Sequence, residues 1–197
     1  MPISNNNEIT VRAKCSYEEL DEELQLRGFK ATNKYNFSDI FLIPREIDIY
    51  KESNRKILEK AVLLREANGI TSNKKSKKIT FKKKVISENG DIVSQSAIKC
   101  QIDNIEDAKN LFIAIGYKQL MKTSEVHTSY KKGNLIFIVK EVNQGSILIE
   151  VETNDTYKTI EELKKIIIDL NISVDLSNLF VKKAEEELQK IKDKGEY

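Results

Sequence analysis

Polar and hydrophobic residues alternate along many segments of this chain, and the alternation is strict in two segments that lie far apart. Successive side chains of a strand point to opposite faces, so every second residue shares a face. The polar positions on such faces are Glu8, Thr10, Arg12 and Lys14 near the start, and Glu150 and Glu152 downstream. Buried charges are costly unless they are paired, bound to a metal or in contact with a charged ligand. The pattern therefore favours either a solvent-facing sheet or a wet, charged cavity.

The same patterns divide the rest of the chain into strands and helices. Alternation predicts strands at residues 8–15, 34–43, 57–66, 78–87, 92–102, 118–130, 134–142 and 146–153. Apolar residues at helical spacing predict helices at about 16–28, 105–115, 159–170 and 176–194. Ser16 and Glu19 have the spacing of a capping box, and Gly28 and Gly116 follow the first two helices as stop signals. Residues 67–78 read as a loop, and residues 88–91 as a hairpin turn.

Eight strands joined by hairpins are enough to form a closed antiparallel β-barrel with room for a ligand. The expected architecture is a single α+β domain over residues 1–197, with a barrel at about 7–154 and a C-terminal helical segment at about 157–195. For one strand alone, a solvated polar face is the simpler interpretation. Polar faces recur on many strands, however, and helices are available to cover the apolar faces. This combination favours a charged tunnel inside the barrel.

Composition excludes several classes of function. Lys and Arg number 33 and Asp and Glu 31, so the net charge of +2 argues against binding nucleic acid through bulk electrostatics. No apolar run is long enough to cross a membrane, and the N-terminus does not resemble a signal peptide. Cys15 and Cys100 lack metal-ligand spacing, so free thiols and a cytoplasmic location are expected. With one histidine, a metal site would need a hard cation held by carboxylates.

Five short segments follow one another along the chain, and they hold Glu8 to Arg12, Asp39 to Phe41, Val62 to Arg65, Thr80 to Lys82 and Glu150 to Glu152. Together they resemble the ordered motifs of the CYTH superfamily of triphosphate tunnel enzymes, which includes class IV adenylyl cyclases, thiamine triphosphatases and inorganic triphosphatases. The family's E-x-E-x-K strand is similar to the segment that holds Glu8, Thr10 and Arg12. The later motifs D-x-Y, L-R-x-R, T-x-K and E-I-E resemble Asp39-Ile-Phe41, Leu63-Leu64-Arg65 after Val62, Thr80-Phe-Lys82 and Glu150-Val-Glu152. The order agrees over nearly all of residues 8–152.

The resemblance implies binding of a triphosphate-bearing small molecule, such as ATP, thiamine triphosphate or inorganic triphosphate. Arg and Lys side chains suit phosphate oxygens, and carboxylates suit Mg²⁺ or Mn²⁺. The phosphate-binding candidates are Arg12, Lys14, Arg65, Lys82 and Lys84. The metal-binding candidates are Glu8, Glu150 and Glu152. The implied activity is that of a metal-dependent triphosphatase or a class IV adenylyl cyclase, with no catalytic residue assigned.

The chain also departs from the family pattern. Residues of another kind stand where acidic or arginine side chains are usual, at Thr10, Leu63, Lys99, Gln101, His127 and Lys140. Two alternatives therefore stay open. One is a non-catalytic module that binds polyphosphate or nucleotides with a degraded metal site, and the other is a barrel that serves only as an interaction scaffold. The last helix is expected to pack on the barrel, or on a second copy in a homodimer.

Overall fold

The computed structural model describes residues 8–86, 92–143 and 145–195, and in these the predicted eight strands and the antiparallel sheet are confirmed. The strands are β1 Glu8–Arg12, β2 Lys30–Pro44, β3 Val62–Gly69, β4 Lys75–Ile86, β5 Ile92–Gln101, β6 Tyr117–Lys132, β7 Leu135–Val142 and β8 Ser146–Glu152. The helices are α1 Tyr17–Leu26, α2 Asn54–Glu59, α3 Ile105–Ala114, α4 Ile160–Leu170 and α5 Lys183–Lys194.

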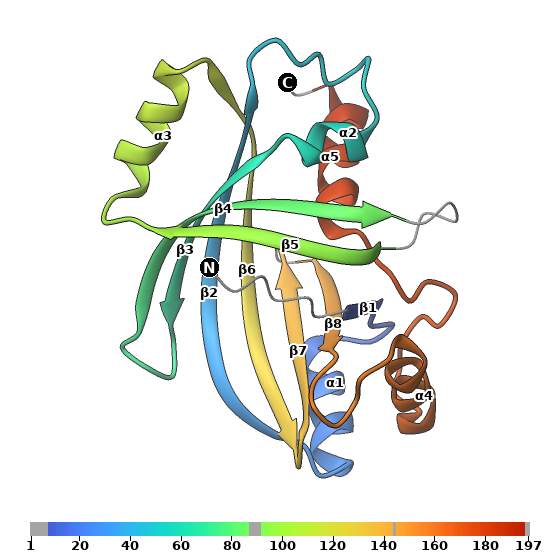
Figure 1. The fold of residues 1–197 in the computed structure, drawn as a ribbon. Helices are drawn as coiled ribbons and strands as arrows, with labels where there is room; N and C mark the ends of the chain where they lie inside the picture. The colour runs from blue at the N-terminus through green and yellow to red at the C-terminus, as the bar shows by residue number, and fades with distance from the viewer. Residues whose placement is uncertain (1–7, 87–91, 144, 196–197) are drawn as a thin grey trace.

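All eight strands belong to one sheet in the order β1-β8-β7-β6-β2-β3-β4-β5, and every strand pair is antiparallel (Figure 1). Strand twist accumulates across so many strands, and the sheet curls around a concave face. The prediction of a closed barrel needs a correction, because no ladder of hydrogen bonds joins β1 to β5 in the described part of the chain. The fold is barrel-like but open along this seam.

The free edge of β1 is covered by residues 173–181, which precede α5 and contact β1 and the residue after it through isolated bridges at Phe180 and Val174. Backbone hydrogen bonds run from Lys14 to Ser173, from Asp175 to Arg12 and from Val181 to Thr10, at 2.7, 2.8 and 2.9 Å between nitrogen and oxygen. The sequence prediction placed part of this segment in a helix from residue 176. It forms turns and isolated bridges instead, and its backbone supplies the partners that an edge strand lacks.

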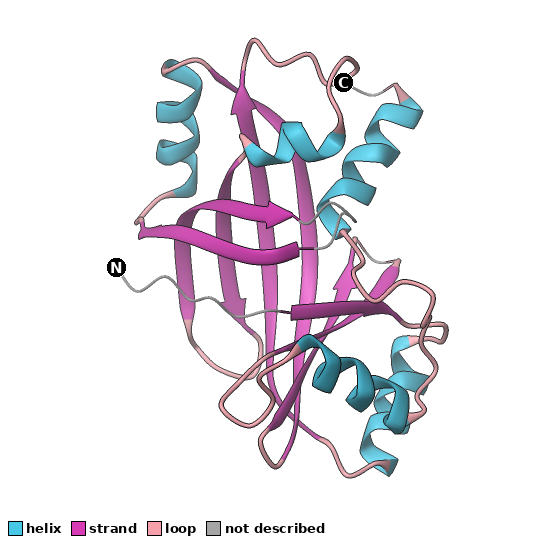
Figure 2. Cartoon of the chain, turned by 45° about the vertical axis from the view of Figure 1, so that its right-hand side comes forward, coloured by secondary structure: helices cyan, strands magenta, loops and turns pink. Residues whose placement is uncertain are grey.

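Helices cover the outer surface of the sheet (Figure 2). Leu20 and Leu24 of α1, with Leu163 and Ile167 of α4, pack on the outer face of β1, β7 and β8. Ala108 of α3 belongs to a smaller cluster on β2 and β3. Two helices, α2 and α5, meet at the end of the sheet where β2 stops, and Leu188 is fully buried there. This contact confirms that the last helix docks on the sheet, while the homodimer stays a prediction.

Local signals explain where the helices begin and end. The predicted capping box of α1 is present, because the amide of Glu19 donates to the Ser16 side chain and the Glu19 carboxylate accepts from the amide of Ser16. Gly28 and Gly116 follow α1 and α3 with φ angles of +83° and +97°, a conformation that favours glycine. These features are set by neighbours in the sequence, and their prediction is confirmed.

Two further predictions of secondary structure are wrong. Residues 57–66 do not form one strand, because Ser53 caps the short helix α2 and β3 begins only at Val62. Residues 67–78 do not form a long loop, because β3 continues to Gly69 and pairs with β4 from Lys75 onwards. Pairing between strands thus extends regular structure into a polar stretch that looks loop-like in isolation. The turn predicted at 88–91 lies outside the described residues.

Candidate functional site

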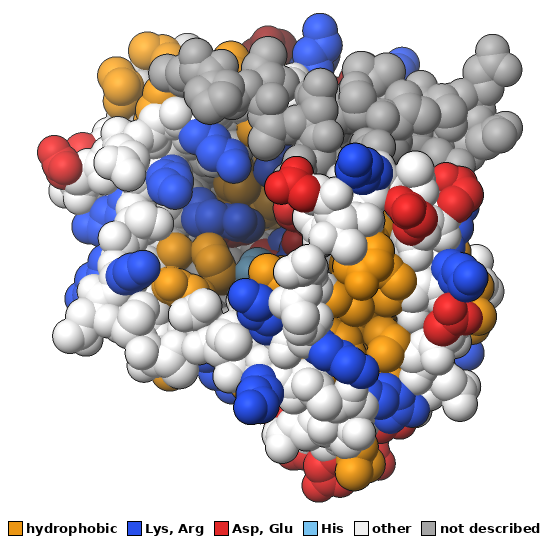
Figure 3. Space-filling model, turned by 60° about the horizontal axis from the view of Figure 1, so that its bottom comes forward, with side chains coloured by type: hydrophobic (Ala, Val, Ile, Leu, Met, Phe, Trp, Pro, Cys, Tyr) orange, Lys and Arg blue, Asp and Glu red, His pale blue; other side chains and the backbone are white. Residues whose placement is uncertain are grey.

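A cavity of about 530 Å³ lies on the concave face of the sheet, and residues from all eight strands line it. Side chains from α2 and from the start of α5 also reach it. Figure 3 shows the hollow, with Lys and Arg side chains gathered around it. The predicted polar faces therefore converge: Thr80, Lys82, Glu150 and Glu152 all line this space. The charged tunnel expected from strand alternation is present.

The three predicted metal ligands come together on one wall of the cavity. Glu8 on β1 faces Glu152 on β8 in the strand register, and Thr10 faces Glu150. One carboxylate oxygen from each of Glu8, Glu150 and Glu152 lies within 4.8 Å of the others. We call these three residues the carboxylate cluster. Oxygen ligands of a single Mg²⁺, Mn²⁺ or Ca²⁺ ion lie about 2.0–2.6 Å from it, so the spacing fits one hard divalent cation.

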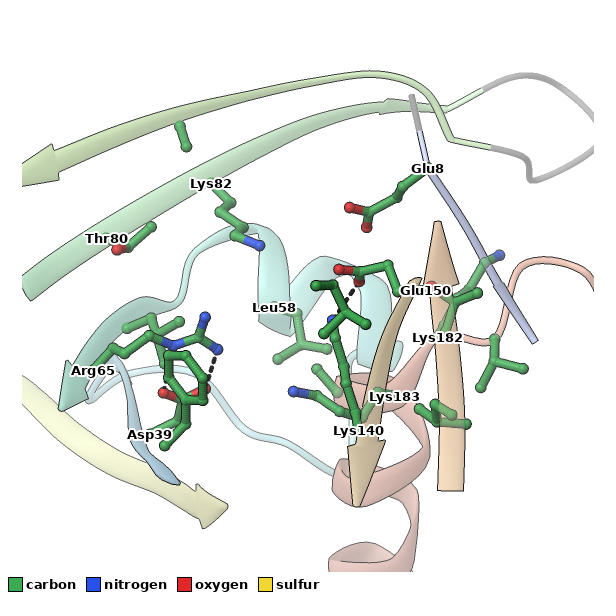
Figure 4. Close-up of a pocket in the computed structure, with 18 of the residues that line it drawn as sticks. Glu8, Asp39, Leu58, Arg65, Thr80, Lys82, Lys140, Glu150, Lys182 and Lys183 are labelled. Atoms are coloured by element: carbon green, nitrogen blue, oxygen red, sulfur yellow. Dashed lines mark hydrogen bonds and ion pairs between the residues drawn. The ribbon is translucent and has the colours of Figure 1, made fainter. Parts of the chain in front are cut away.

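A lysine contacts one of the three carboxylates of the cluster. The Lys140 ammonium on β7 contacts Glu150 Oε2, and both side chains are 14% exposed (Figure 4). Burial alone would lower the pKa of Lys140, but the charge of Glu150 and their hydrogen bond raise it. Burial would likewise raise the pKa of Glu150, and Lys140 lowers it instead. Both groups are therefore held in their charged forms.

Arg65 and Asp39 form a bidentate pair on a different wall. Arg65 Nε and Nη2 donate to the two Asp39 carboxylate oxygens at 2.7 and 2.5 Å. The carboxylate is 1% exposed, whereas the guanidinium side chain is 28% exposed and lies over the ring of Phe37. Burial acts to lower the pKa of Arg65, yet Asp39 raises it. The pair holds the guanidinium in a fixed orientation at the cavity, where an anion can reach it.

A third group of charges lies between these walls. His127 Nε2 lies 2.7 Å from Glu125 Oε2, and the Lys183 ammonium from α5 contacts the other oxygen of Glu125. Burial tends to raise the pKa of Glu125, but His127 and Lys183 lower it strongly. The pKa of His127 is lowered, first by burial and then by Lys140 and Arg65, against the opposing effect of Glu125. Neutral His127 is thus favoured in the folded protein.

The structure adds cavity residues that the sequence did not indicate. Lys182, Lys183 and Glu185 come from the C-terminal segment, and Arg55 comes from α2. Arg55 donates to Glu185 at 2.6 and 2.7 Å, which ties α2 to α5 at this end of the cavity. The amphipathic pattern of the last helix identified its packing face. It gave no sign that lysines near the start of that helix would enter a cavity formed by strands.

The predicted phosphate-binding residues separate into two groups. Arg65 and Lys82 line the cavity, and in Figure 4 Lys82 lies between the Arg65–Asp39 pair and Glu8 with Glu150. Arg12 and Lys14 are not among the lining residues. Arg12 pairs with Glu186 of α5 at 2.5 Å, and Lys14 lies 3.7 Å from Asp175. The side chain of Lys84 falls outside the described part of the chain.

The residues that depart from the family pattern can also be separated into those that line the cavity and those that do not. Thr10, Leu63, Lys99, His127 and Lys140 line the cavity, whereas Gln101 does not. The lining thus contains lysines on β4, β5 and β7, together with Arg65 on β3. Basic side chains reach the cavity from four strands. The carboxylate cluster on β1 and β8 faces those on β3, β4 and β5, and Lys140 on β7 contacts it. This arrangement can hold a polyanion against one wall and a cation against the other.

Comparison with known proteins finds matches among solved structures only. No protein-family profile and no curated protein matches the sequence. PH1819 of Pyrococcus horikoshii OT3 superposes with a TM-score of 0.67 at 19% identity, covering 93% of this chain and 99% of its own. An adenylate cyclase candidate of Vibrio parahaemolyticus gives 0.58 at 11% identity, over 95% and 98% of the two chains. HpAC1 of Hippeastrum, described with a dominant triphosphatase activity, gives 0.54 at 14%, over 88% and 90%.

These similarities cover 88% or more of this chain and 90% or more of each matched chain, so they concern the whole fold and not one part of it. At such low identities they establish the fold. No helix in the described part is both long and apolar enough to span a membrane. The chain therefore shares its fold with these three proteins.

Proposed function

We propose that this protein binds a triphosphate-bearing small molecule in the cavity and hydrolyses or cyclises it with the help of a divalent cation. The observation that carries the proposal is the meeting of two walls in one cavity. Arg65, Lys82 and Lys99 are on β3, β4 and β5, and the carboxylate cluster lies on β1 and β8. A triphosphate carries several negative charges, and neutralising them needs cations from more than one direction.

Each wall has a distinct part in the proposed chemistry. Arg65 is oriented by Asp39 and can donate two parallel hydrogen bonds to one phosphate group. Lys82 and Lys99 supply point charges along the chain of phosphates. The carboxylate cluster would hold Mg²⁺ or Mn²⁺, which supplies charge neutralisation and polarises the phosphoryl group. The attacking group would be water in a triphosphatase, or a ribose hydroxyl in a cyclase.

The shared fold supports this assignment, since HpAC1 is described as a triphosphatase. ATP, thiamine triphosphate and inorganic triphosphate are the substrate candidates, and the cytoplasm is the expected location. A non-catalytic polyphosphate-binding module is the second candidate. The specific observation in its favour is Lys140, which already places a positive charge on Glu150 within the carboxylate cluster.

Binding is tested by thermal unfolding in low salt with inorganic triphosphate. A ligand at one hundred times its Kd stabilises the folded state by about 2.7 kcal/mol, which corresponds to a Tm increase of about 5–10 °C for a chain of this size. Lys82→Met should reduce the shift. Lys83→Met is the matched control, because Lys83 is the next residue of β4 and does not line the cavity. No shift in the wild type at millimolar triphosphate would reject the proposed binding.

Turnover separates the two candidates. Release of phosphate and pyrophosphate from inorganic triphosphate, ATP and thiamine triphosphate should be measured with Mg²⁺ and with Mn²⁺. Mn²⁺ is expected to support more activity, because it binds more tightly than Mg²⁺ to a given set of nitrogen and oxygen ligands. Wild-type protein that binds triphosphate but turns over none of the three would favour the non-catalytic module.

A further inference from the structure

Lys140 is placed to do more than balance one carboxylate. Its register partner on β8 is Leu148, and Glu150 lies two residues further along on the same face. A lysine can reach such a diagonal neighbour, and its ammonium contacts Glu150 Oε2. The carboxylate it contacts belongs to the cluster with Glu8 and Glu152. The ammonium therefore contacts one carboxylate of the only acidic cluster of this kind in the described residues.

The surroundings of Lys140 hold its ammonium in this position. The side chain is 14% exposed, and the Glu150 side chain that it contacts is equally shielded from water. Arg65 and Lys82 lie across the same cavity. The ammonium thus contacts the carboxylate cluster inside the same cavity that the proposed phosphate-binding side chains line.

We propose that Lys140 is a resident cation of the carboxylate cluster. The cavity would then bind a triphosphate anion without a divalent ion, and a divalent ion would enter only after the ammonium leaves Glu150. This inference rests on the proposed function for its ligand. Two like charges in one carboxylate cluster repel each other, so the lysine and the metal compete.

The first test measures metal binding in the absence of any phosphate ligand. Metal-free protein is titrated with MnCl₂, and the affinity is read by calorimetry or by the electron spin resonance of free Mn²⁺. Lys140→Met should bind Mn²⁺ about tenfold more tightly than the wild type or better. Lys140→Arg keeps a cation at this position and should stay close to the wild type. Equal Mn²⁺ affinity in wild type and Lys140→Met would overturn the proposal.

Lys99→Met is the control for net charge. Lys99 lines the same cavity, but no ion pair among the described residues joins it to the carboxylate cluster. Its removal should leave Mn²⁺ affinity within about twofold of the wild type, since about 0.4 kcal/mol corresponds to that factor. If Lys99→Met gains as much Mn²⁺ affinity as Lys140→Met, the total charge of the cavity determines the affinity and the contact with Glu150 does not. That outcome would also overturn the proposal.

The second test measures binding of sodium tripolyphosphate in EDTA. The wild type should bind, and Lys140→Met should bind about tenfold more weakly, because the cation between the anion and Glu150 is lost. Glu150→Gln should bind at least as tightly as the wild type, because it releases the ammonium and removes a negative charge. If Lys140→Met does not fold, Glu150→Gln still tests the proposal. Loss of anion binding in Glu150→Gln would contradict the resident-cation role.

The results of these tests distinguish a failure of the proposed function from a failure of the proposal for Lys140. If tripolyphosphate binds neither with EDTA nor with Mn²⁺, the proposed function is wrong, while the MnCl₂ titration still reports on Lys140. If tripolyphosphate binds only in the presence of Mn²⁺, the proposed function survives and the resident-cation role is rejected.

Discussion

β7 and β8 carry apolar side chains on their outer face and charged side chains on their inner face. Outward-facing Phe137, Val139 and Ile149 are at most 1% exposed and pack under α1 and α4. Inward-facing Lys140 and Glu150 line the cavity and are charged. Burial of apolar area stabilises the outer side, whereas pairing keeps the inner charges tolerable in a partly buried place. One face maintains the fold and the other is left available for a ligand.

The largest effect on stability is expected from the outer face. Phe137 is fully buried and stacks on Phe29 with ring centroids 4.9 Å apart. Phe137→Ala should lower the free energy of unfolding by about 3–5 kcal/mol, because it removes buried area and leaves a void. Urea unfolding measures this loss. Ile136→Ala is the matched control, since Ile136 is the preceding residue, is 45% exposed and should change stability by about 0.5 kcal/mol or less.

A smaller loss should follow from breaking the best pair on the inner face. Asp39→Asn keeps the shape but removes the charge that holds Arg65, and about 1.5–3 kcal/mol is the expected cost of such a charge-assisted contact. A double-mutant cycle with Arg65→Gln should give a coupling free energy of about 0.5–3 kcal/mol. Additive effects of the two substitutions would mean that the pair contributes nothing, and that cavity water replaces it without loss.

A change at the exposed end of the carboxylate cluster should separate binding from stability. Glu152 is exposed and lines the cavity, so Glu152→Gln should alter the free energy of unfolding by about 0.5 kcal/mol or less. Its Mn²⁺ affinity should nevertheless fall by about tenfold, the scale on which groups that hold or orient a metal act. Calorimetry and urea unfolding on the same preparation give both values. An unchanged affinity would remove Glu152 from the metal site.

The smallest expected effect is the pH dependence that comes from His127. Its pKa in the folded protein is lowered, so between that value and the unfolded value of about 6.5 the unfolded state binds more protons. Its contribution to stability is therefore complete above pH 6.5 and is lost as pH falls through the folded pKa. Glu125, whose pKa is also lowered, loses its contribution only below about pH 4.3.

His127→Gln should consequently flatten the plot of stability against pH between 4.5 and 6.5. The measurement is urea unfolding at intervals across this range, with Lys83→Met as a surface control. A slope that is the same in His127→Gln and wild type would show that another group is responsible for acid sensitivity in this window.

The sequence by itself determined which side chains of a strand share a face. Alternation with a period of two is a local property, so Glu8, Glu150, Thr80 and Lys82 could be assigned to inner faces before their partners were known. Helix caps at Ser16 and Thr159 are equally local, because each cap bonds to a residue three positions later. The apolar residues on the opposite faces likewise led to the expectation that helices cover them.

Only the tertiary structure decided which charges meet. Arg12 shares a strand face with Glu8, yet it pairs with Glu186, 174 positions away, and does not line the cavity. Lys183 reaches Glu125 from a helix whose pattern indicated packing alone, and residues 173–181 bond to β1 where a helix had been predicted. Local sequence patterns fix the direction of a side chain along its own element. The partner of a charge depends on how distant elements dock, because electrostatic pairing acts through space and takes no account of distance along the chain.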